Sequence, residues 1–219
     1  MGSTFIASRC ALVATRGPNA LIRGNMPLLG ADNHFALNEI EAAAGVPLGS
    51  RPFLEFPIID NVGERAQFVP LVKAFGVDPA TMPADAWPWW EHGVGGDTPR
   101  GTTLTTEGRA VPGSLTWRPF EGLPEGADPK PFLHAPGWDY VGFVEHVDRV
   151  LTGGSGVVVY VHCQLGADRT GAFHAGLLLK QGYTLKDALR IASTATSAGS
   201  PNSDYLRLVA AYAEELGQR

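Results

Sequence analysis

The sequence is poor in cysteine and in charged residues. Its 219 residues include two cysteines, Cys10 and Cys163, which could form at most one bridge, so a disulfide-stapled scaffold is excluded. Charged residues make up only 18%, with 17 basic against 22 acidic side chains and no block rich in lysine or arginine. Because nucleic-acid binding requires a basic stripe or patch, we expect no nucleic-acid partner.

Long apolar runs are also missing. No run approaches the roughly 18 residues that a membrane-spanning helix needs, so the sequence predicts no integral membrane segment. The first fifteen residues lack a basic start and are interrupted by Arg9, which makes them a poor signal peptide. We therefore expect a cytoplasmic protein, and a signal peptide removed beforehand would leave no trace in this sequence.

Turn-forming residues, in contrast, are abundant. Glycine and proline number 27 and 17, and they follow no triplet period, so they indicate many ordered turns rather than a fibrous protein. With 44% hydrophobic residues, a chain of this length can bury its own core, and we predict a single domain over 1–219. Within it, 76–113 is rich in proline and contains Trp87, Trp89 and Trp90, which predicts an insertion or lid on the substrate side.

Patterns typical of strands and helices alternate along the rest of the chain. Strands are expected within 4–23 and over 53–59, 114–120 and 156–162. Helices are expected before Gly45, around 68–75, over 140–151 and 170–181, after Thr184 and over 205–216. Asp32 or Asn33 is predicted to cap the first helix, and Asp139 and Thr184 to cap later ones. The alternation predicts an α/β fold with a central, mostly parallel sheet flanked by helices.

One loop combines the features of an anion-binding site. It lies between an apolar strand and a helix and reads His-Cys-Gln-Leu-Gly-Ala-Asp-Arg-Thr-Gly from His162 to Gly171. A glycine at its middle allows the backbone to curl, so that successive amides and the helix N-terminus point at one ligand. An arginine at its end can bind two phosphate oxygens at once. The predicted phosphate-binding residues are Gln164, Leu165, Gly166, Ala167, Asp168 and Arg169.

The same loop predicts a cysteine nucleophile. The positive field that binds phosphate also favours the thiolate form of Cys163, and the hydroxyl of Thr170 could assist departure of the sulfur in a second step. His162 is expected to order the loop rather than act as a base. Cys10 has an arginine at the same spacing but lacks a glycine between them, so we interpret it as a core residue, with resolution of an oxidised Cys163 as the alternative.

These residues resemble the signature of the cysteine-dependent phosphatase superfamily, which is His-Cys, five residues, Arg, then Ser or Thr. The match runs from His162 to Thr170, and the segment 19–27 also resembles the N-terminal strand of bacterial dual-specificity-like phosphatases. The resemblance implies a protein-tyrosine-phosphatase-like fold, a phosphocysteine intermediate and a general acid on a mobile loop. It also implies a reaction without metal or other cofactor.

Several carboxylates compete for the role of general acid. Asp128 is our first candidate, because the resemblance implies an acid some thirty-odd residues before the cysteine on a loop after a strand, and Asp128 lies 35 residues before Cys163, after the strand expected at 114–120. Asp168 is its rival, because an aspartate directly before the arginine resembles myotubularin-like lipid phosphatases and some bacterial tyrosine and lipid phosphatases. Further candidates are Asp60, Glu121, Glu125 and Asp139.

The sequence therefore predicts a phosphomonoester hydrolase acting on a phosphoprotein, a phospholipid or a small phosphate monoester. A loop without lysine in an acidic chain favours phosphotyrosine or a lipid or sugar monoester over highly phosphorylated inositols. Two alternatives stay open. One is a rhodanese-like sulfurtransferase or arsenate reductase, and the other is a non-catalytic module that binds phosphorylated ligands. The histidines show no metal-ligand spacing, so no metal site is predicted.

Overall fold

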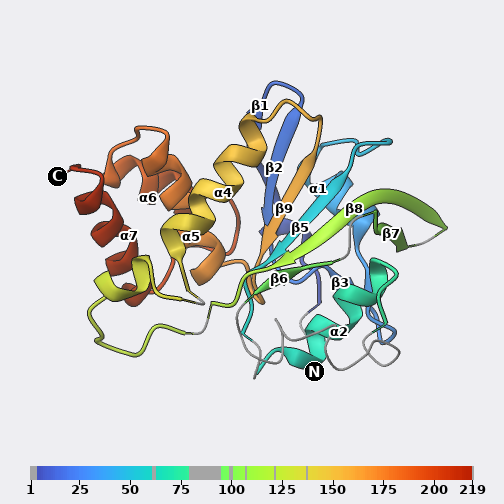
Figure 1. Cartoon of the computed structure of the whole chain (residues 1–219), viewed down its shortest axis with the longest axis horizontal. Helices are drawn as coiled ribbons and strands as arrows, with labels where there is room; N and C mark the ends of the chain where they lie inside the picture. The colour runs from blue at the N-terminus through green and yellow to red at the C-terminus, as the bar shows by residue number, and fades with distance from the viewer. Residues whose placement is uncertain are drawn as a thin grey trace.

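A mixed β-sheet forms the centre of the molecule (Figure 1). The computed structural model describes residues 4–60, 63–78, 95–98, 101–106, 108–120, 122–136 and 138–218. Within these residues the strand order is β1-β2-β9-β5-β8-β6, and β7 pairs with β8 outside this path. The strands are β1 (Ala11–Arg16), β2 (Asn19–Gly24), β5 (Phe53–Pro57), β6 (Gly96–Asp97), β7 (Thr103–Thr106), β8 (Arg109–Trp117) and β9 (Val158–His162).

The core of this sheet is parallel. β2, β9, β5 and β8 run in one direction, whereas β1, β6 and β7 pair antiparallel at the margins. Parallel strands require crossover connections, and helices provide them here. The predicted α/β class with a mostly parallel central sheet is therefore confirmed.

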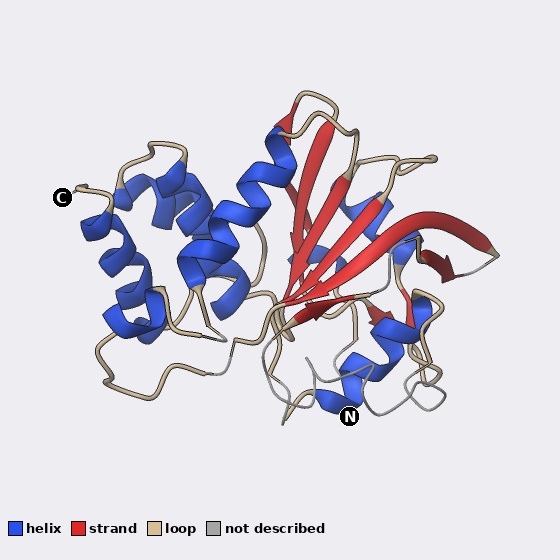
Figure 2. Cartoon of the chain, in the orientation of Figure 1, coloured by secondary structure: helices blue, strands red, loops and turns tan. Residues whose placement is uncertain are grey.

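Helices cover both faces of the sheet (Figure 2). One face packs against α4 (Tyr140–Thr152) and α5 (Asp168–Lys180), and α6 (Leu185–Thr194) and α7 (Ser203–Glu215) pack against α5 on the outside. The other packs against α1 (Leu37–Ala44), α2 (Arg65–Ala74) and the small β3 (Leu28–Leu29) and β4 (His34–Phe35) hairpin. Short 3-10 helices lie at η1 (Ala7–Arg9) and η3 (Lys130–Leu133).

Alternation along β9 divides its side chains between these two layers. Val159 and Val161 pack into the core under α4 to α7, and Val158 and Tyr160 pack into the core under α1 and α2. All four are completely buried. A strand buried on both faces explains the uninterrupted apolar run that precedes the cysteine loop.

Two of the three predicted helix caps are confirmed. The Asp139 carboxylate accepts the Gly142 amide at 3.0 Å at the start of α4, and the Thr184 hydroxyl accepts the Asp187 amide at 3.2 Å at the start of α6. The cap at Asp32 or Asn33 is wrong. Those residues form the turn between β3 and β4, and α1 begins at Leu37 without a side-chain cap.

The segment 76–113 is more regular than the sequence suggested. Its described residues include β6, β7 and the first half of β8, all of which extend the central sheet. The insertion or lid expected over 76–113 therefore stays a prediction. Trp87, Trp89 and Trp90 lie outside the described residues. Among the helices that the structure describes, none is long and apolar enough to cross a membrane.

Candidate active site

The cysteine loop lies at the carboxyl end of the central strand. Cys163 directly follows β9, between the parallel neighbours β2 and β5, and α5 begins five residues later at Asp168. Ligands of α/β sheets bind at this edge, where a helix N-terminus adds its positive field. The Cys163 side chain is buried, with 2% of its surface exposed. The topology therefore puts the candidate nucleophile in the interior, at the carboxyl edge of the sheet, rather than on a free surface.

The loop carbonyls are all held behind the loop. Each of the four oxygens from position 164 to 167 accepts a hydrogen bond from a neighbouring segment. The pairs are Gln164 O with the Met26 amide at 3.2 Å, Leu165 O with Arg9 Nη1 at 3.1 Å, Gly166 O with Arg23 Nη2 at 2.6 Å and Ala167 O with the Gly171 amide at 2.8 Å.

The loop amides, in contrast, are left without acceptors. The Gly166 amide donates to Cys163 Sγ at 3.3 Å. Among the described residues, no acceptor binds the amides of Gln164, Leu165, Ala167, Asp168 and Arg169. A buried donor without a partner is costly, and a tetrahedral anion seated in the loop would satisfy several of these amides at once. An anion beside the sulfur would therefore fit this arrangement of the loop.

Gly166 makes this loop conformation possible. Its φ angle is +74°, and a Cβ at this position would lie 2.9 Å from the Gly24 carbonyl oxygen at the end of β2. Both the left-handed backbone and the close approach of β2 exclude a larger side chain. The predicted function of the central glycine is therefore consistent with the observed backbone.

Arg169 is held from one side by a carboxylate. Glu64, just before α2, accepts Arg169 Nη1 at 2.6 Å and Nη2 at 2.7 Å, and Phe120 O accepts Nη1 at 3.2 Å. Three of the five guanidinium hydrogens are thereby used, which leaves Nε–H and one Nη2–H as a parallel pair for a ligand. Burial alone would lower the pKa of Arg169, but the hydrogen bonds to Glu64 and the nearby sulfur raise it above its ordinary value.

A second buried carboxylate lies beneath the loop. Glu55 on β5 and His162 on β9 are both fully buried, and Glu55 Oε1 lies 2.7 Å from His162 Nε2. Burial raises the pKa of Glu55, and the hydrogen bond to the imidazole opposes part of that rise. The other ring nitrogen lies 3.3 Å from the Cys163 carbonyl. His162 therefore connects β5 to the first peptide of the loop, as expected for an ordering residue.

A cleft of about 400 Å³ opens over the loop. Its lining residues come from the ends of β5 and β8, from the loop and from the start of α7: Asp60, Gly63, Glu64, Gly122, Gln164, Asp168, Arg169, Asn202 and Tyr205. Tyr205 is 5% exposed, and burial raises its pKa well above the ordinary value. The hydroxyl of Thr170, at the first turn of α5, is buried and has no hydrogen-bond partner among the described residues.

The candidate acids occupy different places. Asp60 and Asp168 line the cleft; the Asp168 carboxylate accepts the Asn202 amide at 2.6 Å, and the Asp60 carboxylate accepts the Gly63 amide at 2.5 Å. Asp128 is exposed, accepts the Lys130 amide at 3.1 Å and does not line the cleft. Of the remaining candidates, Glu125 is exposed, Asp139 caps α4 and Glu121 lies outside the described residues.

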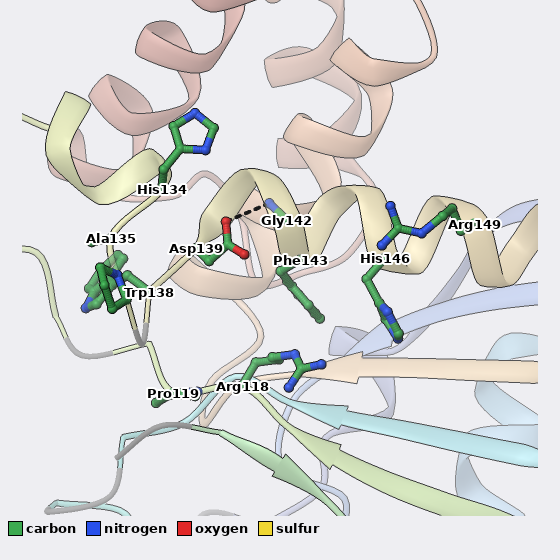
Figure 3. Close-up of a pocket in the computed structure, with 11 residues that line it drawn as sticks. Arg118, Pro119, His134, Ala135, Trp138, Asp139, Gly142, Phe143, His146 and Arg149 are labelled. Carbon is green, nitrogen blue, oxygen red and sulfur yellow. Dashed lines mark hydrogen bonds between the residues drawn. The ribbon is translucent and has the colours of Figure 1, made fainter. Parts of the chain in front are cut away.

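A larger cavity of about 620 Å³ lies between α4 and the end of β8 (Figure 3). Arg118 and His146 extend into it from these two elements, and Asp139 is turned back to cap its own helix. Burial, and then the charges of Arg118 and Arg149, lower the pKa of His146. The cavity contains no cysteine, and Pro119 on its lining is followed by Phe120, which contacts Arg169.

Three residues of this arrangement were missed by sequence reasoning: Arg23, Glu55 and Glu64. Arg23 lies inside the segment 19–27, which we had singled out only for its resemblance. Glu55 is the lone charge in the apolar run 53–59, and that isolation was a usable signal. Glu64 has no local signal, because only the tertiary fold brings it to Arg169. Within the described residues, no group of three or more histidine, cysteine or acidic side chains could hold a metal.

Comparisons with known proteins find similarity to solved structures alone. No protein-family model and no curated protein matches the sequence. Solved structures that match include human DUSP28, at 14% identity over 94% of this chain and 97% of that chain, with a TM-score of 0.46. Tk-PTP in its active form matches at 13% over 94% and 97%, with a TM-score of 0.47, and Trypanosoma brucei protein tyrosine phosphatase TbPTP1 at 12% over 92% and 71%, with a TM-score of 0.49.

Proposed function

We propose that this protein is a phosphoric monoester hydrolase that works through a phosphocysteine intermediate. The observation that carries the proposal is the loop itself: its carbonyls are bound from behind while its amides lack acceptors around Cys163. A phosphate monoester dianion fits this environment because it offers three oxygens to the amides and to the free pair of Arg169 hydrogens.

The proposed reaction has two steps. The Cys163 sulfur attacks phosphorus in line with the ester oxygen, the phosphorus–oxygen ester bond breaks, and an acid gives its proton to the departing oxygen. Water then attacks the phosphocysteine, the same carboxylate accepts a proton from it, and inorganic phosphate leaves with the sulfur restored. Thr170 is suited to donate its unpartnered hydroxyl to the departing sulfur.

The acid is one of three aspartates. Asp60 and Asp168 line the cleft, and each carboxylate accepts one backbone amide, from Gly63 and Asn202 respectively. We favour Asp60, with Asp168 second, because the Asp60 amide donates to Glu64, the carboxylate that holds Arg169. Asp128 remains in the proposal as the candidate that would have to move, since it lies exposed on the connection between β8 and α4.

The proposed substrates are phosphotyrosine in proteins and lipid or sugar monoesters. The cleft has one arginine, no lysine and three carboxylates among its lining residues, which disfavours ligands that carry many phosphates. Tyr205 at its wall offers an aromatic surface to a phenyl phosphate. We propose that the protein acts in the cytoplasm and needs no metal.

The test is hydrolysis of a panel of monoesters in the presence of a chelator. The panel contains phosphotyrosine and phosphoserine peptides, phosphoinositides, inositol phosphates and nucleotides, compared by kcat/KM. Cys163→Ser should lower turnover by at least about 1,000-fold while phosphate still binds. Cys10→Ala is the matched control, because Cys10 is buried and its burial raises the thiol pKa to about 12, so this variant should keep turnover.

Other outcomes would point elsewhere. Undiminished hydrolysis by Cys163→Ser would refute the covalent mechanism. Phosphate binding without hydrolysis of any ester would support a non-catalytic binding module, and sulfur transfer without hydrolysis would support a rhodanese-like activity.

A further inference from the structure

Arg23 is a fully buried arginine without an acidic partner. It projects from β2 toward α5 and α6, and none of its surface is exposed. Nη1 donates to the Ala192 carbonyl at 2.7 Å, Nη2 donates to the Gly166 carbonyl at 2.6 Å, and Nη1 lies 3.3 Å from His174 Nδ1. Nε has no partner, and no carboxylate among the described residues pairs with this guanidinium.

A buried cation in this state needs a compensating negative charge. Removing an ion from water costs several kcal/mol unless a counter-charge or good hydrogen bonds replace the solvent. The neighbouring imidazole cannot help, because burial and the adjacent guanidinium lower the pKa of His174 to about 3 and keep it neutral. Burial lowers the pKa of Arg23 itself to about 10, and the loop sulfur opposes part of that change. The Cys163 sulfur is therefore the negative group in the loop that offsets part of the burial cost of Arg23.

The contact with Gly166 also sets the direction of a loop amide. A trans peptide is planar, so the amide of residue 167 points opposite to the carbonyl of residue 166. Because Arg23 draws the Gly166 carbonyl behind the loop, the Ala167 amide is directed to the ligand side, where it has no acceptor among the described residues. The carbonyl of Leu165, by comparison, is held by the exposed contact from Arg9.

We propose that Arg23 is a positioning residue of the active site, which fixes the Gly166 peptide and supplies a buried positive charge to the Cys163 sulfur and to the bound phosphoryl group. The inference rests on the proposed function, since it assigns the charge to the nucleophile and ligand of that reaction. It does not make Arg23 a contact of the substrate, because its hydrogen bonds run to the back of the loop.

Other groups around the sulfur do not provide the same charge. The titratable and charged groups that interact with the sulfur are one residue each from β2, β9, α5 and α7. Two carboxylates lie farther away, because Glu55 is bound to His162 and Glu64 is bound to Arg169. Arg169 is already paired with Glu64. The tyrosines are neutral, because burial raises both of their pKa values. The groups that interact directly are Arg23, Tyr160, Arg169 and Tyr205.

The experiment compares Arg23→Met and Arg23→Lys with a matched control, all in a Cys10→Ala background. Arg51 suits the control because it also binds only backbone carbonyls, those of Pro18, Gly156 and Val157. These lie at the opposite end of β9, roughly 20 Å from Cys163 along the strand. The readouts are the pH profile of Cys163 alkylation by iodoacetamide, the affinity for inorganic phosphate, and Tm.

The expected results separate charge from geometry. Arg23→Met should move the alkylation midpoint upward by about 1–2 pH units and weaken phosphate binding by about tenfold or more. Arg23→Lys keeps the charge, so its alkylation midpoint should stay close to that of the parent. It should still bind phosphate more weakly than the parent, because one ammonium cannot bind two carbonyls in the same geometry. Arg51→Met should lower Tm without changing either profile.

Two results would overturn the inference. One is a folded Arg23→Met protein whose alkylation midpoint and phosphate affinity match those of the parent. The other applies if Arg23→Met does not fold: an Arg23→Lys protein that binds phosphate as tightly as the parent would then overturn the inference. Alkylation needs no turnover, so these outcomes are distinct from failure of the proposed function, which would appear as a parent protein that hydrolyses no ester.

Discussion

Replacing Glu64 with glutamine tests what the carboxylate does to Arg169. The two side chains are 6% and 15% exposed, and two short hydrogen bonds join them. Glu64→Gln keeps the shape and one oxygen, but its amide group turns a donor toward a guanidinium donor. Losing one charge-assisted hydrogen bond is worth about 1.5–3 kcal/mol. If the carboxylate orients Arg169 for the ligand, kcat/KM should fall by about 10- to 150-fold.

The competing interpretation predicts that Glu64→Gln increases phosphate affinity instead of lowering kcat/KM. Glu64 also brings negative charge close to a dianionic ligand, so its neutralisation could strengthen phosphate binding if the pair mainly blocks the arginine. Steady-state kinetics and phosphate titration of the same variant separate the two interpretations. An increase in kcat/KM or in phosphate affinity would refute the positioning argument. Glu41→Gln is the matched control, because Glu41 pairs with Arg109 at a partly buried site away from the loop and should leave kcat/KM unchanged.

Three further predictions concern the loop and its surroundings. Gly166→Ala should abolish phosphate binding and lower the unfolding free energy by about 1–3 kcal/mol, because φ is +74° and the new Cβ would meet the last carbonyl of β2; a phosphate titration and a urea melt check this. Burial lowers the pKa of His174 to about 3 in the folded protein, whereas the histidine pKa in the unfolded chain is near ~6.5. The contribution of neutral His174 to stability is therefore complete above about pH 6.5 and is lost as pH falls, because only the unfolded chain then takes up the proton. Between pH 7 and about 4, the free energy of unfolding from urea melts should therefore fall by up to about 1.4 kcal/mol per pH unit more in the parent than in His174→Asn. Equal dependence of this free energy on pH in the two proteins would contradict the prediction. Among the Asp60→Asn, Asp128→Asn and Asp168→Asn variants, Asp60→Asn should be the one whose kcat/KM no longer declines at high pH, and retention of that decline would assign the acid to one of the other two.

The sequence was informative where local physics dominates. The uninterrupted apolar run before Cys163 predicted a doubly buried strand, and Gly166 predicted a left-handed turn at the position where the structure has one. The caps at Asp139 and Thr184 were also predictable, because such caps use residues only three positions apart. These features together were enough to predict the α/β class, which the structure confirms.

Prediction failed where tertiary pairing overrides local pattern. Pro112 belongs to the proline-rich segment 76–113, in which no strand was predicted, yet it lies within β8 and pairs with Thr103 on the marginal strand β7, where a missing amide is tolerated. Asn33 looked like a helix cap but occupies a left-handed turn position, with φ of 51°, in the β3–β4 hairpin. The turn satisfies its preference, and the helix begins later without a cap.

The partners of the loop could not be found from sequence either. Arg23 reaches the Gly166 carbonyl across 143 residues, and Glu64 reaches Arg169 across 105. Only the parallel pairing of β2, β9 and β5 brings these distant segments to one edge. A spacing rule for the general acid had the same weakness, since Asp128 has a suitable position in the chain but lies outside the cleft lining that includes Asp60.

The central claim is that Cys163 carries the phosphoryl group during turnover. It is tested most directly by rapid acid quenching of the protein with a phenyl phosphate substrate, followed by mass spectrometry of the peptide that contains the loop. The account predicts a single phosphoryl group on the Cys163 sulfur, formed in a burst and lost at the rate of turnover. Hydrolysis that proceeds with an unmodified Cys163 at every time point would contradict it.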